Sequence, residues 1–205
     1  KRPDGRTVYG FAVEQWTGWW YNFLRRNGGK IMEGDKCVLA DPRYLAANAE
    51  ALQFLSDMMN VHHVAPTPGQ GKDLGNDLAY PFMNGMIAMC AYGRLQCLKF
   101  KNINKFKWNV AAMPRRNTKF ASLFTVCYSI AKESKRPEDA WKLVKYLTGP
   151  EGQIQTAESA LAMPTRISLV KSDHFMHPPV LPAYVSSQPY VDAVPFAEPT
   201  PLHPR

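Results

Sequence analysis

The pattern of apolar positions predicts a buried strand followed directly by an amphipathic helix. Residues 8–13 are mostly apolar, which is typical of a short strand in a core. Beyond them, apolar side chains recur at intervals that predict a helix ending at Gly28 and Gly29. The side chains of this stripe are Trp16, Trp19, Trp20, Phe23 and Leu24. The strand therefore leads a cluster of tryptophans into the start of a helix.

A second helix is expected over residues 42–60. Pro42 suits the first turn of a helix, and Asp41 can cap it. The predicted apolar stripe of this helix consists of Leu45, Ala49, Leu52, Leu55 and Met59. We expect this stripe to face the core.

Further strands and a short helix are predicted in the middle of the chain. A short helix over residues 76–83 leads through a turn at residues 84–85 to a strand over residues 86–92. Two more strands are expected over residues 107–113 and 123–131, which are apolar and rich in residues that favour strands. Strands that alternate with helices indicate an α/β fold.

The clearest helix boundaries lie near residue 140. Pro137 starts a predicted helix and Gly149 ends it, with Trp141, Val144 and Leu147 on one face. Thr148 and Glu151 have the spacing of a capping box, which predicts another helix over residues 150–159. Of the 17 prolines, nine lie between Pro164 and Pro204, where they disfavour long helices and favour extended or turn backbone.

The charge and the hydropathy exclude two classes of protein. The 25 Lys and Arg against 17 Asp and Glu give a net charge of +8, but the basic residues lie in short pairs, so no nucleic-acid partner is expected. No apolar stretch approaches the roughly 18 residues of a membrane span, and residues 1–10 are too polar for a signal peptide. Because the chain does not begin with Met, we expect a processed chain or a piece of a longer one.

Cysteines and histidines offer no metal site. The cysteines lack the spacing of a zinc or redox motif, and a buried thiol is expected at Cys90 and at Cys127, with a disulfide as the alternative in an oxidising compartment. The pairs His62–His63 and His174–His177 are interpreted as surface or packing residues. We expect no metal and no cofactor.

Enzyme signatures are absent from the sequence. There is no G-x-S-x-G, no P-loop, no G-x-G-x-x-G and no H-E-x-x-H motif. One alternative stays open, which is a hydrolytic enzyme with a carboxylate such as Glu14 as its base. A second is an interaction domain whose aromatic patch binds protein.

The aromatic cluster is the best candidate for a binding site. Trp16, Trp19 and Trp20 follow a strand and open a helix, which is where α/β folds commonly bind ligands. A tryptophan face can cover the flat C–H face of a sugar while neighbouring polar groups bond its hydroxyls. Core packing is the alternative, and it applies most to Trp19 and Trp20.

Several segments in order along the chain carry a resemblance to a known family. The segment from Phe82 to Pro114 has the pattern F-x-x-G-x-x-A-M, a short strand, Gly, and F-x-W-x-V-A-x-x-P. It resembles the extracellular solute-binding proteins of sugar ABC importers, the maltose-binding-protein-like family. The resemblance continues through residues 9–11, 28–29, 129–135, 140–141, 146–153 and 163–166.

The resemblance implies the C-terminal lobe of a two-lobed fold. The expected fold class is α/β, a periplasmic-binding-protein-like (class II) C-terminal lobe with a layered sheet and flanking helices, the first lobe being absent. Residues 1–130 would form the α/β core of the lobe. Residues 131–172 would form a hinge-crossing helical segment that packs on the first lobe, and residues 173–205 would return to the core as a proline-rich strap.

The resemblance also implies a receptor for transport. Such a protein would bind a small molecule, expected to be a sugar or oligosaccharide, and deliver it to an ABC transporter permease. It would be periplasmic or extracellular, with a lipoprotein anchor as one possible attachment to the membrane. It would not be an enzyme. In this piece of the chain, we expect the helices over residues 137–159 to self-associate or to repack on the lobe's own core.

The family's ligand-contacting positions transfer to particular residues of this chain. The expected ligand-binding residues are Trp16, Thr17, Trp19, Tyr92, Gly93, Arg94, Phe124 and Arg166. Leu95 stands where the family commonly has a stacking tryptophan, and Leu123–Phe124 replaces a Gly–Gly pair, so Phe124 is expected to project into the cleft. Arg94 would form a fork with sugar hydroxyls or a carboxylate, or else serve as a surface ion pair.

Overall fold

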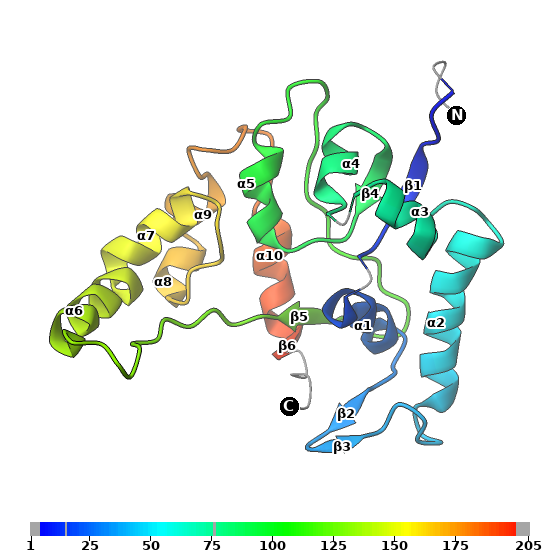
Figure 1. Ribbon diagram of the computed structural model, residues 1–205, viewed down its shortest axis with the longest axis horizontal. Helices are drawn as coiled ribbons and strands as arrows, with labels where there is room; N and C mark the ends of the chain where they lie inside the picture. The colour runs from blue at the N-terminus through cyan, green and yellow to red at the C-terminus, as the bar shows by residue number, and fades with distance from the viewer. Residues whose placement is uncertain (1–4, 15, 76, 200–205) are drawn as a thin grey trace. The chain divides into compact units, whose positions relative to one another are not determined.

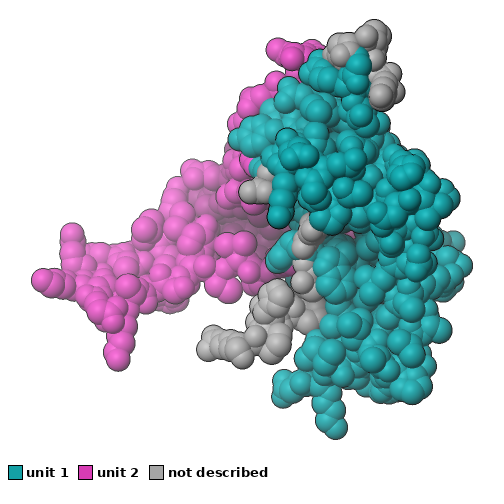
Figure 2. Space-filling view, turned by 45° about the vertical axis from the view of Figure 1, so that its right-hand side comes forward, with its two compact units in different colours: residues 1–92, 113–123, 195–205 teal, residues 93–112, 124–194 magenta. Residues whose placement is uncertain are grey.

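The computed structural model describes residues 5–14, 16–75 and 77–199 (Figure 1). The chain divides into two compact units, which Figure 2 shows in different colours. Unit 1 consists of residues 1–92, 113–123 and 195–205, and unit 2 consists of residues 93–112 and 124–194. No helix within the described ranges is long and apolar enough to cross a membrane.

Unit 1 combines short strands with helices. Its strands are β1 (Tyr9–Ala12), β2 (Met32–Glu33), β3 (Lys36–Cys37), β4 (Ile87–Cys90), β5 (Ala121–Leu123) and β6 (Ala197–Pro199). Its helices are α1 (Thr17–Arg26), α2 (Leu45–Asn60), α3 (Pro68–Asp73) and α4 (Ala79–Met83).

Unit 2 is helical in its described part. Its helices are η1 (Arg94–Gln96), α5 (Cys97–Phe100), α6 (Pro137–Thr148), α7 (Pro150–Glu158), α8 (Ile167–Val170), α9 (Asp173–Met176) and α10 (Gln188–Ala193). The helices after Pro164 are all short, as the density of prolines predicts. A last 3₁₀ turn, η2 (Val194–Phe196), leads from unit 2 back into unit 1.

A parallel pair of strands joins distant parts of unit 1. β1 and β4 pair in parallel, with Ala12 aligned to Cys90. Ala12 and Ile87 are buried with Leu78 in one apolar cluster. Both strands lie within the ranges predicted from the sequence, so these two predictions are confirmed. Because the pair is parallel, the carboxyl ends of both strands lie at the same edge.

Helix α1 packs against α2 over a second apolar cluster. Leu55, Met58 and Ala65 are buried there, and Trp20 and Phe23 of α1 pack against them. Trp20 therefore serves the core, which is the alternative that the helical periodicity left open. On another face of α1, the buried Tyr21 ring meets Phe120 edge to face, with the ring centroids 5.5 Å apart.

The predicted start of α2 is wrong, and its predicted buried face is confirmed only at Leu55 and at Met59, which packs against the buried cluster. The helix begins at Leu45, because residues 42–44 form a turn in which Asp41 Oδ1 accepts the backbone N–H of Arg43 at 2.9 Å. The residues of α2 that are buried are Asn48, Ala51, Leu55 and Met58, whereas Leu45, Ala49 and Leu52 of the predicted stripe are exposed.

The side chain of Asn48 explains this orientation of α2. It lies buried between two loops, where Asn48 Oδ1 accepts the backbone N–H of Lys30 at 3.0 Å. Asn48 Nδ2 donates to the carbonyls of Lys30 and Leu39, at 2.9 Å each. A Cβ at Gly29 would collide with Asn48 Oδ1, so the close approach requires glycine there. The polar Asn48 is therefore part of the buried face of α2, where the predicted stripe contained only apolar residues.

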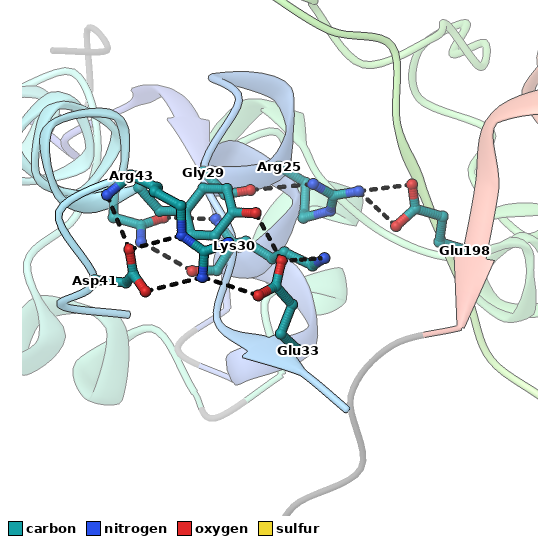
Figure 3. A network of polar contacts seen from close by, with 9 residues as sticks. Arg25, Gly29, Lys30, Glu33, Asp41, Arg43 and Glu198 are labelled. Carbon is teal, nitrogen blue, oxygen red and sulfur yellow. Dashed lines mark hydrogen bonds and ion pairs between the residues drawn. The ribbon is translucent and has the colours of Figure 1, made fainter. Parts of the chain in front are cut away.

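A network of ion pairs ties the β2–β3 hairpin to the start of α2 (Figure 3). Glu33 accepts hydrogen bonds from the Tyr44 hydroxyl at 2.8 Å, from Lys30 Nζ at 3.2 Å and from Arg43 Nη2 at 3.0 Å. These bonds, that of Tyr44 first, lower the pKa of Glu33 to about 2. Arg43 likewise lowers the pKa of Asp41 to about 2. Both carboxylates therefore stay ionised well below neutral pH.

Strands β5 and β6 form another small sheet, and β6 is bonded to α1. β5 and β6 pair in parallel, with Ala121 aligned to Ala197. Arg25 of α1 binds both carboxylate oxygens of Glu198 through Nη2, at 2.6 and 2.5 Å, and its Nη1 donates to the Gly29 carbonyl (Figure 3). Segments far apart in the sequence are thus held to one helix.

The strands predicted over residues 107–113 and 123–131 are wrong. Of these residues, only Leu123 is in a strand, at the end of β5. Trp108 is buried against Phe100, with ring centroids 5.4 Å apart, so the apolar residues of the first segment belong to a packed loop. In the second segment Val126 is 82% exposed, and no apolar face is buried there that would favour a strand.

Gly149 joins helices α6 and α7, as the C-cap of the first and the N-cap of the second. Both helices start at the predicted prolines, but the predicted capping box is wrong, because Gly149 in extended conformation is the N-cap of α7. The Thr148 hydroxyl instead donates to the Val144 carbonyl at 2.8 Å. A Cβ at Gly152 would lie 2.5 Å from the carbonyl oxygen of Leu147, so this position also requires glycine.

All four cysteines are free thiols. Cys90 is partly buried, and burial raises its pKa to about 12. The prediction of a buried thiol at Cys127 is wrong, because the segment that follows β5 is exposed. Within the described part of the chain, no group of three or more His, Cys, Asp or Glu side chains could hold a metal ion.

Replacing Asn48 by Ala should destabilise unit 1. The substitution leaves the Lys30 N–H and two partly buried carbonyls without their partner, which predicts a loss of about 2–4 kcal/mol in the free energy of unfolding. Urea unfolding followed by circular dichroism, with hydrogen exchange of the Lys30 amide, measures the effect. Asn60→Ala, at the exposed end of the same helix, is the control and should cost less than about 0.5 kcal/mol. Equal losses in both variants would contradict the role of Asn48.

Candidate functional site

The candidate site lies where the chain leaves β1 and β4. Glu14 and Trp16 follow β1, and Tyr92 follows β4. Since the strands are parallel, these side chains emerge at the same edge of the pair. Ligands of α/β folds commonly bind at such an edge, where turns and helix starts replace the sheet.

Three rings form a continuous row at this edge, and we call Trp16, Trp19 and Tyr92 the aromatic row. The Trp16 and Trp19 rings meet edge to face, with centroids 5.8 Å apart and planes at 74°. The Trp19 and Tyr92 rings meet in the same way, at 6.0 Å and 82°. Edge-to-face packing is a preferred arrangement of aromatic side chains. The row is therefore an ordered apolar surface.

Trp16 is the exposed end of the row. It is the N-cap residue of α1, in extended conformation, and it is 46% exposed. Trp19, one turn further along α1, is partly buried beneath it, and its backbone N–H donates to the Trp16 carbonyl at 2.9 Å. The start of the helix thus positions one indole toward solvent on top of another.

A single carboxylate binds the two inner members of the row. Trp19 Nε1 donates to Glu14 Oε2 at 3.1 Å, and the Tyr92 hydroxyl donates to Glu14 Oε1 at 2.7 Å. The Tyr92 hydroxyl also lies 3.4 Å from Asp77 Oδ1, which accepts the backbone N–H of Ala79 at 2.9 Å. The Glu14 carboxylate, which follows β1, therefore joins the first turn of α1 to the segment that follows β4.

Burial and charge keep the Tyr92 hydroxyl protonated. Burial raises the pKa of Tyr92 far above its ordinary value, and the hydrogen bond to Glu14 raises it further. Burial is also the first cause of the raised pKa of Cys90, to which Glu14 contributes as a negative charge. Both Tyr92 and Cys90 therefore stay protonated at neutral pH.

β5 lies beside the start of α1. The backbone N–H of Ser122 donates to Asn22 Oδ1 at 3.2 Å, and Asn22 Nδ2 donates to the Gly18 carbonyl at 2.9 Å. Leu123, at the end of β5, is 47% exposed. The first turn of α1 is therefore held by a buried asparagine and flanked by an exposed leucine.

The structure brings together only some of the predicted ligand-binding residues. Trp16, Trp19 and Tyr92 lie in contact with one another in unit 1. Thr17 begins α1, but its side chain lies outside the described residues. The remaining predicted residues belong to unit 2 and are Gly93, Arg94, Phe124 and Arg166.

Arg94 is buried rather than presented to solvent. Its guanidinium carbon lies 4.1 Å from the centroid of the Phe175 ring and 5.4 Å from that of Tyr190, and Nη1 donates to Ser187 Oγ at 3.0 Å. The surface ion pair considered from the sequence is therefore wrong, because the guanidinium packs between aromatic rings. Burial lowers the pKa of Arg94.

Phe124 and Arg166 are both on the surface of unit 2. Phe124 is 41% exposed. Arg166 is exposed as well, and its Nη2 reaches the Thr148 carbonyl at 3.5 Å. Their assignment to a ligand site remains a prediction.

Sequence reasoning did not identify the role of Glu14 or the contribution of Asp77. Glu14 was considered only as a catalytic base, although it lies five residues before Trp19 in a segment that must connect a strand to a helix. Asp77 lies in a loop next to a short helix, and the sequence alone does not indicate its proximity to Tyr92. Both depend on the pairing of β1 with β4.

Comparison with known proteins identifies a family. The sequence model of the family described as "Bacterial extracellular solute-binding protein" matches residues 3–183. No curated protein sequence matches the chain significantly. Family and fold therefore depend on the family model and on solved structures.

Solved structures similar to this chain are about twice its length. The ABC substrate-binding protein Lmo0181 from Listeria monocytogenes in complex with cycloalternan has a TM-score of 0.76 and 21% identity, over 98% of this chain and 50% of its own. Maltose-bound MalE3 of T. maritima has a TM-score of 0.74 and 23% identity, over 95% and 50%. UgpB from Mycobacterium tuberculosis in complex with glycerophosphocholine has a TM-score of 0.69 and 18% identity, over 96% and 48%.

These similarities confirm the predicted fold class. The chain has the α/β fold of a periplasmic-binding-protein-like lobe, and it spans about half the length of the structures that it matches. The family match covers most of the described residues, including the aromatic row.

Replacing Trp16 by Ala should cost little stability. Because Trp16 is about half exposed at the end of the row, the loss in the free energy of unfolding should stay below about 1.5 kcal/mol, against roughly 3–5 kcal/mol for a buried aromatic residue. Tyr21→Ala, at a buried position of the same helix, is the matched control and should show the larger loss. Urea unfolding of both variants measures the difference. A loss for Trp16→Ala as large as that for Tyr21→Ala would show that Trp16 is a core residue.

Proposed function

The chain belongs to the family of bacterial extracellular solute-binding proteins, and we propose that it is the carbohydrate-binding half of such a receptor. The observation that carries the proposal is the aromatic row at the carboxyl edge of β1 and β4, with Trp16 exposed at its end. A sugar ring presents a flat C–H face that an exposed indole can cover.

The polar groups beside the row suit hydroxyl-bearing ligands. Tyr92, Glu14 and Asp77 cluster at its inner end, where they supply oxygen acceptors within reach of the apolar surface. Two of the similar structures contain carbohydrates, cycloalternan and maltose, and this supports the same ligand class for this chain. Glycerophosphocholine in a third shows that the fold also accommodates other hydroxyl-bearing ligands.

In the whole receptor, we propose that closure of two lobes buries the ligand and that an ABC transporter permease receives it. The protein would act outside the cytoplasmic membrane, in the periplasm or extracellularly, with a lipoprotein anchor as one form of attachment. Residues 1–130 would form the lobe core, residues 131–172 would cross to the other lobe, and residues 173–205 would return. Ligand contacts of Gly93, Arg94, Phe124 and Arg166, which belong to unit 2, remain predictions from the resemblance.

We propose ligand binding without turnover. Both oxygens of Glu14 accept hydrogen bonds from the row, so this carboxylate acts as an acceptor rather than as a base aimed at a water. The raised pKa values of Tyr92 and Cys90 leave neither as a nucleophile at neutral pH.

Titration with maltose and a panel of neutral oligosaccharides should quench the tryptophan fluorescence of this chain. Trp16→Ala should weaken the affinity of the responding sugar at least about tenfold, equivalent to about 1.4 kcal/mol, because it removes the stacking surface. Tyr184→Ala is the matched control, since Tyr184 is similarly exposed but lies in unit 2, outside the aromatic row and outside α6. Absence of a response to every sugar would contradict the ligand class. Turnover of a chromogenic glycoside would establish an enzyme instead.

We also propose that α6 mediates self-association of this chain. The helix has no buried residue in the structure, and it exposes Trp141, Leu143 and Tyr146. Its first turn is acidic, with Glu138 and Asp139, and its last turn contains Lys145. Two copies paired antiparallel would place the acidic turn of one against the basic turn of the other.

Light scattering should therefore show a concentration-dependent dimer. Trp141→Glu should shift it to monomer, because it places a charge in the apolar face, while Lys171→Glu at another exposed position of unit 2 should not. A chain that stays monomeric at all concentrations would exclude self-association.

A further inference from the structure

Glu14 lies in the segment that connects β1 to α1, and its side chain bonds to residues of two other segments. It lies between β1 and α1, outside both elements. Its two carboxylate oxygens accept from different donors, at 3.1 Å from Trp19 Nε1 and at 2.7 Å from the Tyr92 hydroxyl. Trp19 and Tyr92 come from parts of the chain that only the pairing of β1 with β4 brings close.

These two bonds restrict the rings that make up the aromatic row. A hydrogen bond at the polar end of an indole or phenol ring restricts rotation about its two side-chain torsions, in addition to the restriction by packing. With N–H and O–H both bound to one carboxylate, the Trp19 and Tyr92 rings keep their edge-to-face contact, at centroids 6.0 Å apart. Trp16 in turn packs on Trp19, so the orientation of the exposed indole depends on the inner pair.

We propose that Glu14 is a positioning residue that fixes the aromatic row. The inference deepens the proposed function, since this row is the surface on which the ligand would stack. Glu14 acts through Trp19 and Tyr92, because each of its two carboxylate oxygens accepts a hydrogen bond from one of them.

The same bonds determine what the row offers to a ligand. A Tyr92 hydroxyl that donates to Glu14 presents its oxygen lone pairs as acceptors. Glu14 and Asp77 add negative charge close to this hydroxyl. The inner end of the row therefore favours neutral ligands with hydroxyl donors and disfavours phosphate- or carboxylate-bearing ones.

Hydrogen exchange of the Trp19 indole N–H tests the proposal without any ligand. The indole signals are followed by ¹⁵N NMR, and the Trp19 signal is assigned as the one that Trp19→Phe removes. Glu14→Leu should raise the exchange rate about ten- to hundredfold, because the charged acceptor is lost. Glu14→Gln should retain part of the protection, since its amide oxygen can still accept from the indole.

Two further variants separate positioning from a general loss of structure. Asp57→Leu removes a carboxylate elsewhere in unit 1 and should leave the exchange unchanged. Tyr92→Phe removes one donor only, so the indole of Trp19 should stay protected by Glu14. Circular dichroism confirms that each variant is folded. Unchanged exchange in folded Glu14→Leu, or equal loss in Asp57→Leu, would overturn the proposal.

Titration of the same variants relates the inference to the proposed function. With maltose as the probe, Glu14→Leu should weaken binding at least about tenfold, and Glu14→Gln should restore most of it. If maltose and the other sugars fail to bind the wild-type chain while Glu14→Leu still raises the exchange, the ligand class is wrong and the positioning role stands. If sugars bind both proteins equally, Glu14 does not position the ligand surface.

Discussion

The parallel pairing of β1 with β4 is the constraint on which the candidate site depends. It sets Ala12 against Cys90, so the segments that follow these residues leave at one edge. This pairing brings Glu14 and Tyr92 within hydrogen-bonding distance, although four helices and the β2–β3 hairpin lie between them in the sequence. A change of register would move every side chain after the strands and would separate the carboxylate from the hydroxyl.

The three tryptophans of one helical stripe have three different surroundings. Trp20 packs on the buried cluster of α2, Trp19 lies beneath the surface with its indole bonded to Glu14, and Trp16 is exposed at the N-cap. The spacing of the three tryptophans predicts one common apolar face. Their neighbours in the fold differ, because α1 starts at the edge of the β1–β4 pair. Core and binding surface are therefore continuous in this part of the fold.

Sequence patterns gave the fold class, the central strands and the long helices, and they failed where a polar or loop residue decided the packing. Asn48 sets the orientation of α2 through bonds to Lys30 and Leu39, which apolar periodicity cannot indicate. The segment around Trp108 was predicted to be a strand because it is apolar, but it is a loop in which Trp108 packs on Phe100. For the site, the aromatic cluster after the first strand indicated Trp16 and Trp19, and the resemblance added Tyr92. The role of Glu14 depends on the proximity of distant chain segments, which no local pattern contains.

The order of β5 and β6 in the sequence has a consequence for how the protein is made. Residues 124–194, the larger segment of unit 2, lie between these paired strands, so β6 reaches its partner only after all of unit 2 has been synthesised. Until then α1 lacks the Arg25–Glu198 pair that fastens it to the strand, and the sheet edge of β5 stays open. Unit 1 therefore cannot be completed until the chain that follows unit 2 is present, and a protein shortened before β6 would leave both α1 and β5 without these contacts.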